Sequence, residues 1–176
     1  MSSSKVTRIC TQRVLDSHKD HHHNTRHDTR LRAAFWNSKV WPSNSTITIS
    51  FLDDPSPNQP RTPASALEKV GQNVDPLQKT LQNTPLKEAL KTIVTERIQP
   101  LIGLTLKFVK DKDEKADIRI SFKDHNSSWS LVGTDSKHKE AFDKGASMNL
   151  GWFDVGTYIH EFGHALGMIH EHQNPH

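Results

Sequence analysis

The chain has 176 residues, a formal net charge of +3 and only 33% hydrophobic residues. This length fits one ordinary domain and leaves no room for two large independent cores. Because the hydrophobic fraction is low, we expect a packed domain together with some disordered length. Residues 1–30 hold six basic and three acidic side chains, so they account for the whole net charge (6 − 3 = 3). The rest of the chain is neutral, and a nucleic-acid-binding surface is not expected there.

The sequence does not favour a membrane protein, a secreted protein or a small protein stabilised by disulfide bonds. No run approaches 18 apolar residues, so we expect no transmembrane helix. Residues 1–25 contain no apolar stretch of signal-peptide length, so we expect no export by the ordinary secretory route and, by default, a cytoplasmic location. Cys10 is the only cysteine, which excludes an internal disulfide.

Residues 1–35 are predicted to form a disordered, basic and His-rich tail, and residues 36–176 to form the folded domain. The tail carries a cluster of five histidines: His18, His21, His22, His23 and His27. Such a cluster can bind metal loosely, but without fixed geometry we interpret it as a polar segment with no specific ligand.

The first half of the folded part predicts one strand and one well-defined helix. Residues 46–52, TITISFL, are β-branched and aromatic with a period of two, which is typical of a strand, and turn-forming residues follow them. Residues 64–82 are only weakly helical. From Pro85 to Ile98, apolar residues recur at spacings of three and four, which predicts a helix with one buried face.

The second half predicts several strands and a final helix. Residues 104–109 and 117–122 alternate apolar and polar side chains, as half-buried strands do. Residues 129–135, WSLVGTD, are expected at the edge of the sheet on the side of a cleft, and residues 147–153 add a further strand. A helix follows from about residue 157 to the end of the apolar pattern near 169. We therefore predict an α+β fold with one mixed sheet and two helices packed on it.

The final helix contains the pattern H-E-x-x-H-x-x-G-x-x-H within Thr157 to His170. His160 and His164 lie one turn apart on one helix face, so both imidazoles can converge on one ion. Gly167 can adopt the left-handed conformation that ends the helix and turns the chain back, so that His170 completes the set. Three nitrogen ligands leave a fourth tetrahedral position for water, as a catalytic zinc site requires.

Glu161 follows the first of these histidines and can accept a proton from such a water. Zinc lowers the pKa of bound water from 15.7 towards about 7, so a carboxylate with a near-normal pKa suffices as general base. The same carboxylate can pass the proton to a leaving amine. These roles predict a zinc-dependent endopeptidase that hydrolyses the peptide bonds of a polypeptide substrate.

An ordinary amphipathic helix is the alternative interpretation of this segment. An apolar stripe formed by Ile159, Phe162, Leu166 and Ile169 would pack on a core with or without a metal. We accept that the stripe is part of the core. It does not explain five specified residues in register, and we therefore favour a metal site.

The motif HEFGHALGMIH, followed by EHQNP, resembles the zinc signature of the metzincins and is most similar to the astacin group of metalloendopeptidases. The upstream segments ADIRISF, SWSLVGTD and SMNLGWFD resemble the strands that precede the zinc helix in that group. The resemblance spans roughly residues 40–176. It implies that His160, His164 and His170 are zinc ligands and that Glu161 is the catalytic base. It also implies a twisted sheet with two helices, whose lower edge strand lies antiparallel to bound substrate.

Two elements of this family are expected downstream of the third histidine: a Met-containing turn beneath the metal and a tyrosine shortly after it. The chain's methionines are Met1, Met148 and Met168, and its only tyrosine, Tyr158, precedes the first histidine. We therefore expect residues 36–176 to be the N-terminal part of the catalytic domain, without the second subdomain. Such a chain should bind zinc detectably but hydrolyse protein weakly or not at all, and a catalytically silent zinc-binding remnant is the alternative.

Other conspicuous residues are given structural roles. His172 and His176 lie close to the motif in sequence, but a solvent-facing or supporting role is favoured because three ligands suffice. Trp129 and Trp152 are expected in the core or in a cleft wall. Cys10 lies in the predicted tail, where a role as a metal-blocking thiolate has little support.

Overall fold

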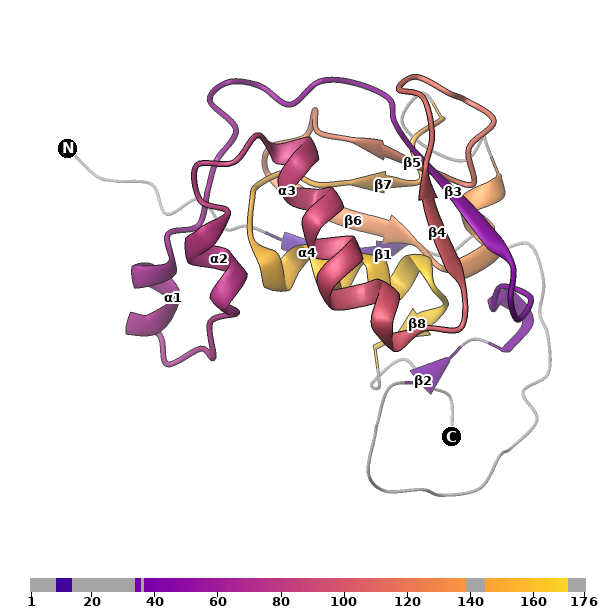
Figure 1. Cartoon of the computed structure of the whole chain (residues 1–176), viewed down its shortest axis with the longest axis horizontal. Helices are drawn as coiled ribbons and strands as arrows, with labels where there is room; N and C mark the ends of the chain where they lie inside the picture. Colours follow the sequence, from indigo (N-terminus) through magenta and orange to yellow (C-terminus); the bar gives the residue numbers. More distant parts are fainter. Residues whose placement is uncertain (1–8, 14–33, 36, 139–144, 171–176) are drawn as a thin grey trace.

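One mixed sheet of six strands organises the protein in the computed structural model, which describes residues 9–13, 34–35, 37–138 and 145–170. The strand order is β1-β6-β7-β5-β3-β4 (Figure 1). The strands are β1 (Ile9–Arg13), β3 (Thr46–Phe51), β4 (Thr105–Phe108), β5 (Ile118–Ser121), β6 (Ser127–Leu131) and β7 (Met148–Asn149). β3 pairs in parallel with β4 and β5, β5 pairs in parallel with β7, and β6 runs antiparallel to β7. The expected α+β fold with one mixed sheet is confirmed.

Helices connect the strands and cover one face of the sheet. The α-helices are α1 (Ala64–Lys69), α2 (Pro76–Thr80), α3 (Leu86–Ile93) and α4 (Val155–Ala165). α3 continues through a π-helical turn, Val94–Ile98, into a 3-10 turn, Gln99–Leu101. Two further 3-10 turns span Asn37–Lys39 and Gly133–Lys137. A separate two-stranded sheet pairs β2 (Ala34–Phe35) with β8 (Met168–Ile169) in antiparallel orientation. None of the helices in the described part of the chain combines the length and hydrophobicity of a membrane span.

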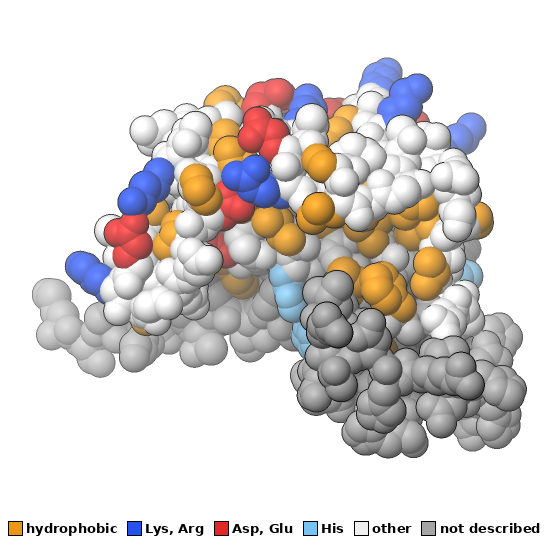
Figure 2. Space-filling model, turned by 60° about the horizontal axis from the view of Figure 1, so that its bottom comes forward, with side chains coloured by type: hydrophobic (Ala, Val, Ile, Leu, Met, Phe, Trp, Pro, Cys, Tyr) orange, Lys and Arg blue, Asp and Glu red, His pale blue; other side chains and the backbone are white. Residues whose placement is uncertain are grey.

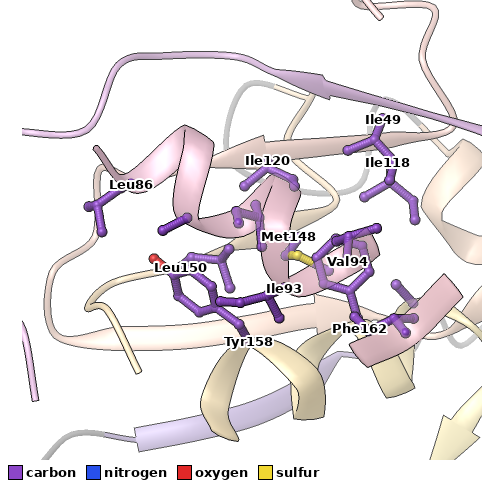
Figure 3. Packing of buried hydrophobic residues seen from close by; sticks show 14 of the residues in the cluster. Ile49, Leu86, Ile93, Val94, Ile118, Ile120, Met148, Leu150, Tyr158 and Phe162 are labelled. Atoms are coloured by element: carbon purple, nitrogen blue, oxygen red, sulfur yellow. The ribbon is translucent and has the colours of Figure 1, made fainter. Parts of the chain in front are cut away.

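The main core lies between the sheet and the pair α3 and α4. α3 buries the face that its apolar spacing predicts: Leu86, Ala89, Leu90 and Ile93. Figure 3 shows how Ile93 and Val94 pack against Ile120 and Met148 of the sheet, and how Tyr158 and Phe162 of α4 approach the same cluster. The predicted packing of both helices on one sheet is therefore observed.

Strand β1 falls within the range predicted to be a disordered tail. Its residues pair in parallel with β6, from Ile9 opposite Ser127 to Arg13 opposite Leu131. The five histidines predicted for that tail lie outside the described residues. The sequence predicted that residues 129–135 lie at the edge of the sheet. This prediction is wrong for β6, because β1 forms the edge strand next to it. Local composition did not reveal this strand because its partner is more than one hundred residues away in the chain.

Strand β5 is buried on both faces, whereas its alternation predicted one solvent-exposed face. Arg119 is only 1% exposed and donates hydrogen bonds from Nε to the Gly145 carbonyl and from Nη1 to the carbonyls of Ala116 and Asp117. These carbonyls pair with two of the three guanidinium nitrogens of a cation that the sequence pattern placed in water, and the buried Nη2 atom has no hydrogen-bond partner among the described residues. Trp129 lies in a second, smaller apolar cluster and is fully buried, as predicted for a core tryptophan.

Helix α4 begins two residues before the predicted start and ends four residues before the end of the apolar pattern. The Asp154 carboxylate accepts a hydrogen bond from the Thr157 amide at 2.8 Å and caps the N-terminus. At the other end Leu166 is the C-cap residue, and Gly167 follows with a φ of 108°. The helix therefore ends inside the motif that it carries.

Candidate metal centre

Three imidazoles converge at the end of α4. His160 and His164 lie on the helix, and His170 follows β8 directly. The Nε2 atoms of His160 and His164 are 3.0 Å apart, those of His164 and His170 are 3.1 Å apart, and those of His170 and His160 are 3.0 Å apart. The structure thus brings together the three histidines that the sequence singled out. Among the described residues, they form the one group of metal-ligating side chains that approach this closely.

The end of α4 makes this convergence possible. The Gly167 amide donates to the His164 carbonyl at 2.8 Å, and the positive φ of Gly167 turns the chain out of the helix. Met168 and Ile169 then run as β8 beside β2. In a continuing helix, residue 170 would lie about one and two-thirds turns beyond His164, so its ring would leave the site.

A main-chain carbonyl orients His164. The Nδ1 atom of His164 lies 2.8 Å from the Met168 carbonyl oxygen, which can only accept a hydrogen bond, so Nδ1 carries the proton. In the neutral ring, Nε2 then presents a lone pair to the other two imidazoles. Sequence analysis missed this interaction because a carbonyl group has no signature in the sequence.

Burial favours the neutral form of two of these imidazoles, His160 and His164. It lowers the pKa of His164 to about 4, and the nearby rings of His160 and His170 contribute in the same direction. Burial also lowers the pKa of His160, with a smaller contribution from His170. Neutral imidazoles are the form that binds a metal ion, so at pH 7 these two rings need lose no proton before binding.

The site is buried on one side and open on the other. His164 is 2% exposed, whereas His160 is exposed and His170 is half-buried. Figure 2 shows histidine side chains reaching the surface on the face of the molecule that is turned forward. One ring therefore anchors the centre from within the protein, while the other two border the solvent.

Glu161, the predicted general base, is completely buried on α4. Tyr158, one turn earlier, packs edge-to-face on Phe153 at 5.7 Å between ring centroids, and burial raises the pKa of its hydroxyl. Tyr158 is therefore a core residue. His172 and His176 lie outside the described residues.

The sequence comparison assigns the zinc-motif half of the chain to a known family. The model of the astacin peptidase family matches residues 82–176, which is more than half of the chain. The chain belongs to the astacin family. The match includes α3, the strands from β4 to β7 and all three converging histidines. The family is one of zinc metallopeptidases, as the sequence motif indicated.

Two solved structures of myroilysin are similar to this chain. A structure of myroilysin superimposes with a TM-score of 0.53 at 28% sequence identity, over 79% of this astacin-family chain and 55% of the myroilysin chain. A crystal structure of myroilysin gives a TM-score of 0.48 at 22% identity, over 93% of this chain and 52% of that one. This chain thus spans about half the length of the myroilysin chains. No curated protein sequence matches it significantly.

Proposed function

We propose that the chain holds one zinc ion between His160, His164 and His170 and uses it to hydrolyse peptide bonds in a polypeptide substrate. The observation that carries the proposal is the mutual distance of 3.0–3.1 Å between the three Nε2 atoms. Ligand atoms at Zn–N distances of about 2.0–2.1 Å in a tetrahedral arrangement lie roughly 3.3 Å apart, so small side-chain adjustments suffice. Three neutral imidazoles are also a donor set that suits zinc.

Each residue then has a defined part in the reaction. The zinc ion, when bound, supplies a Lewis acid for the scissile carbonyl and lowers the pKa of the attacking water. Glu161 accepts a proton from that water on its carboxylate and delivers it to the leaving amine. The Met168 carbonyl holds the His164 ring so that Nε2 faces the centre. Burial of Glu161 brings its carboxylate into a region of low dielectric, where its interactions are stronger than in water.

The test combines metal analysis with hydrolysis of a fluorogenic casein-type substrate. We expect about one zinc per chain in the wild type and in Glu161→Gln, and loss of zinc in His164→Ala. Hydrolysis should fall by roughly 10²–10⁴-fold in Glu161→Gln, because general-base catalysis is worth that factor. Glu96→Gln, at an exposed glutamate on the π-helical turn, is the matched control and should leave both measurements unchanged.

Two outcomes would contradict this function. Full zinc binding by His164→Ala would remove the proposed ligand set. Stoichiometric zinc in the wild type without any hydrolysis that depends on Glu161 would favour a silent zinc-binding protein instead.

A further inference from the structure

The last turn of α4 leaves a carbonyl group that the helix itself does not satisfy. The amides of Leu166 and Gly167 donate to carbonyls within the helix, those of Phe162, Gly163 and His164. The Ala165 carbonyl would accept from the amide of residue 169 in a continuing helix, but Ile169 belongs to β8. A donor from elsewhere in the chain must take its place, or a buried acceptor would be left unpaired.

Trp41 supplies that donor from a distant part of the sequence. Its indole Nε1 donates to the Ala165 carbonyl oxygen at 2.7 Å, across 124 positions in the chain, and the bond is buried. The indole is 4% exposed and belongs to the main core cluster. The Nζ of Lys137 lies 5.1 Å from the centroid of the ring, on its face. The core cluster, the Lys137 ammonium and the Ala165 carbonyl thus all contact the indole ring of Trp41.

The residues just before Trp41 hold the same turn from the other side. Val40 lies against Gly167, whose Cβ position is 3.4 Å from the Val40 Cγ2 atom. The Lys39 ammonium pairs with the Asp135 carboxylate at 2.6 Å, and both side chains are largely buried. Further upstream, β2 pairs with β8, with Phe35 opposite Met168. Residues 34–35 and 37–41, which we call the strap, therefore contact the chain on each side of the helix end.

We propose that Trp41 is a positioning residue for the third ligand, His170. Its indole N–H replaces the main-chain donor that the helix loses, which allows the chain to leave α4 after Ala165 and to bring His170 back to His160 and His164. The inference rests on the proposed zinc centre for its functional meaning, but the hydrogen bond itself can be tested in the metal-free protein. Trp41 acts on the third ligand through the main chain of the helix end.

The experiment compares the full chain with its Trp41→Phe variant, which keeps an apolar ring and removes the N–H group. Trp129→Phe is the matched control, because Trp129 is also a buried tryptophan but belongs to the separate smaller cluster. Zinc affinity is measured by competition with a chromophoric chelator, and ligand geometry by the visible absorption of the cobalt-substituted protein. Hydrogen exchange of the Gly167 and Tyr158 amides is followed in the metal-free protein, and urea unfolding of each variant reports its stability.

We expect Trp41→Phe to bind zinc roughly 10–100-fold more weakly, as when other groups that orient metal ligands are removed, and to change the cobalt spectrum. The Gly167 amide should exchange faster, while the Tyr158 amide near the start of α4 keeps its protection. Trp129→Phe should lose stability without these effects.

Unchanged zinc affinity and unchanged Gly167 protection in Trp41→Phe would overturn the inference, as would an equal loss of zinc affinity in Trp129→Phe. If Trp41→Phe does not fold, the protection of the Trp41 indole N–H in the wild type decides, since fast exchange of that proton would rule out the hydrogen bond. Failure of the wild type to bind zinc would instead contradict the proposed function, and Gly167 exchange would still test the role of Trp41 at the helix end.

Discussion

At the scale of single residues, two glycines, Gly133 and Gly167, allow main-chain segments to meet near the end of α4. Gly133 has a φ of 52°, and a Cβ atom there would overlap the main-chain carbonyl of Lys39. It would also lie 3.3 Å from the Cα atom of Gly167. A side chain at position 133 would therefore push the strap away from the helix end that it contacts.

Replacing Gly133 by alanine should destabilise the protein more than its left-handed conformation alone explains. That conformation costs an alanine roughly 1–2 kcal/mol, and the overlap with Lys39 adds to it. Gly71→Ala is the matched control, because Gly71 has a φ of 71° but nothing within 4 Å of its Cβ position. Urea unfolding of both variants measures the difference. Equal losses of stability would show that the contact with Lys39 imposes no constraint.

At the scale of elements, a half-buried ion pair ties α2 to the π-helical turn that follows α3. Asp75 caps α2 by accepting a hydrogen bond from the Leu77 amide at 2.8 Å. The same carboxylate binds Arg97 through two hydrogen bonds, from Nε at 2.8 Å and from Nη2 at 3.1 Å. The Arg97 hydrogen bond, together with the Leu77 amide, lowers the pKa of Asp75 despite partial burial.

This shift predicts how stability depends on pH. Because the folded state holds Asp75 at a pKa below its usual 3.8, the unfolded chain takes up the proton first as the pH falls. The stabilisation is therefore complete at pH values well above 3.8 and is lost as the pH falls below about 4. The free energy of unfolding of the wild type should exceed that of Asp75→Asn by about 1–2 kcal/mol at pH 7, and this difference should be smaller at pH 3. Urea unfolding at both pH values measures this difference. A difference that does not change with pH would contradict the lowered pKa of Asp75 in the folded protein.

Packing of α3 on the sheet gives a second prediction at this scale. Leu90 is fully buried in the main core cluster. Leu90→Ala should lower the free energy of unfolding by about 2–5 kcal/mol, because it removes contacts and leaves a cavity. Leu101→Ala is the control, since Leu101 is 82% exposed and should change stability by less than about 0.5 kcal/mol. Similar losses in both variants would argue against the packing of α3.

At the scale of the whole molecule, the two ends of the described chain meet at the lower side of the sheet. β1, near the start of the chain, pairs with β6, and the strap contacts the end of α4. Figure 1 shows β1 and β2 close to the yellow C-terminal elements α4 and β8. The resemblance to the family predicts an edge strand along which an extended substrate lies antiparallel, and we take β6 as the strand that this prediction concerns. β1 already occupies that edge, in the parallel direction.

Removal of residues 1–13 should expose the edge of β6. A fluorescent peptide with an extended main chain should then bind at least about 10-fold more tightly, measured by anisotropy in a Glu161→Gln background that prevents cleavage. The same peptide with alternate amides methylated is the control, because it cannot form main-chain hydrogen bonds along a strand. Equal affinity of the unmethylated peptide for both chains would show that β1 does not limit access to this edge.

Much of the fold was predictable because the signals are local. A period of two in TITISFL and the apolar spacing after Pro85 place β3 and α3 correctly, since each pattern reports the face that an element buries. The candidate metal centre could also be predicted from sequence, because its signals are local. His160 and His164 are four residues apart on one helix, and Gly167 turns the chain at the end of that helix. The assignment of Glu161 as the base, and the domain boundary at residue 36, remain predictions.

Only the tertiary structure decided which distant segments complete these elements. No local pattern in the sequence predicts the parallel pairing of β1 with β6 or the hydrogen bond from Trp41 to the Ala165 carbonyl. Nor does one predict the burial of Arg119 on β5. The physical reason is that main-chain donors and acceptors are the same at every position, so sequence does not specify which of them will meet. The sequence by itself determined three histidines on a helix and its turn, and the fold determined what holds that turn in place.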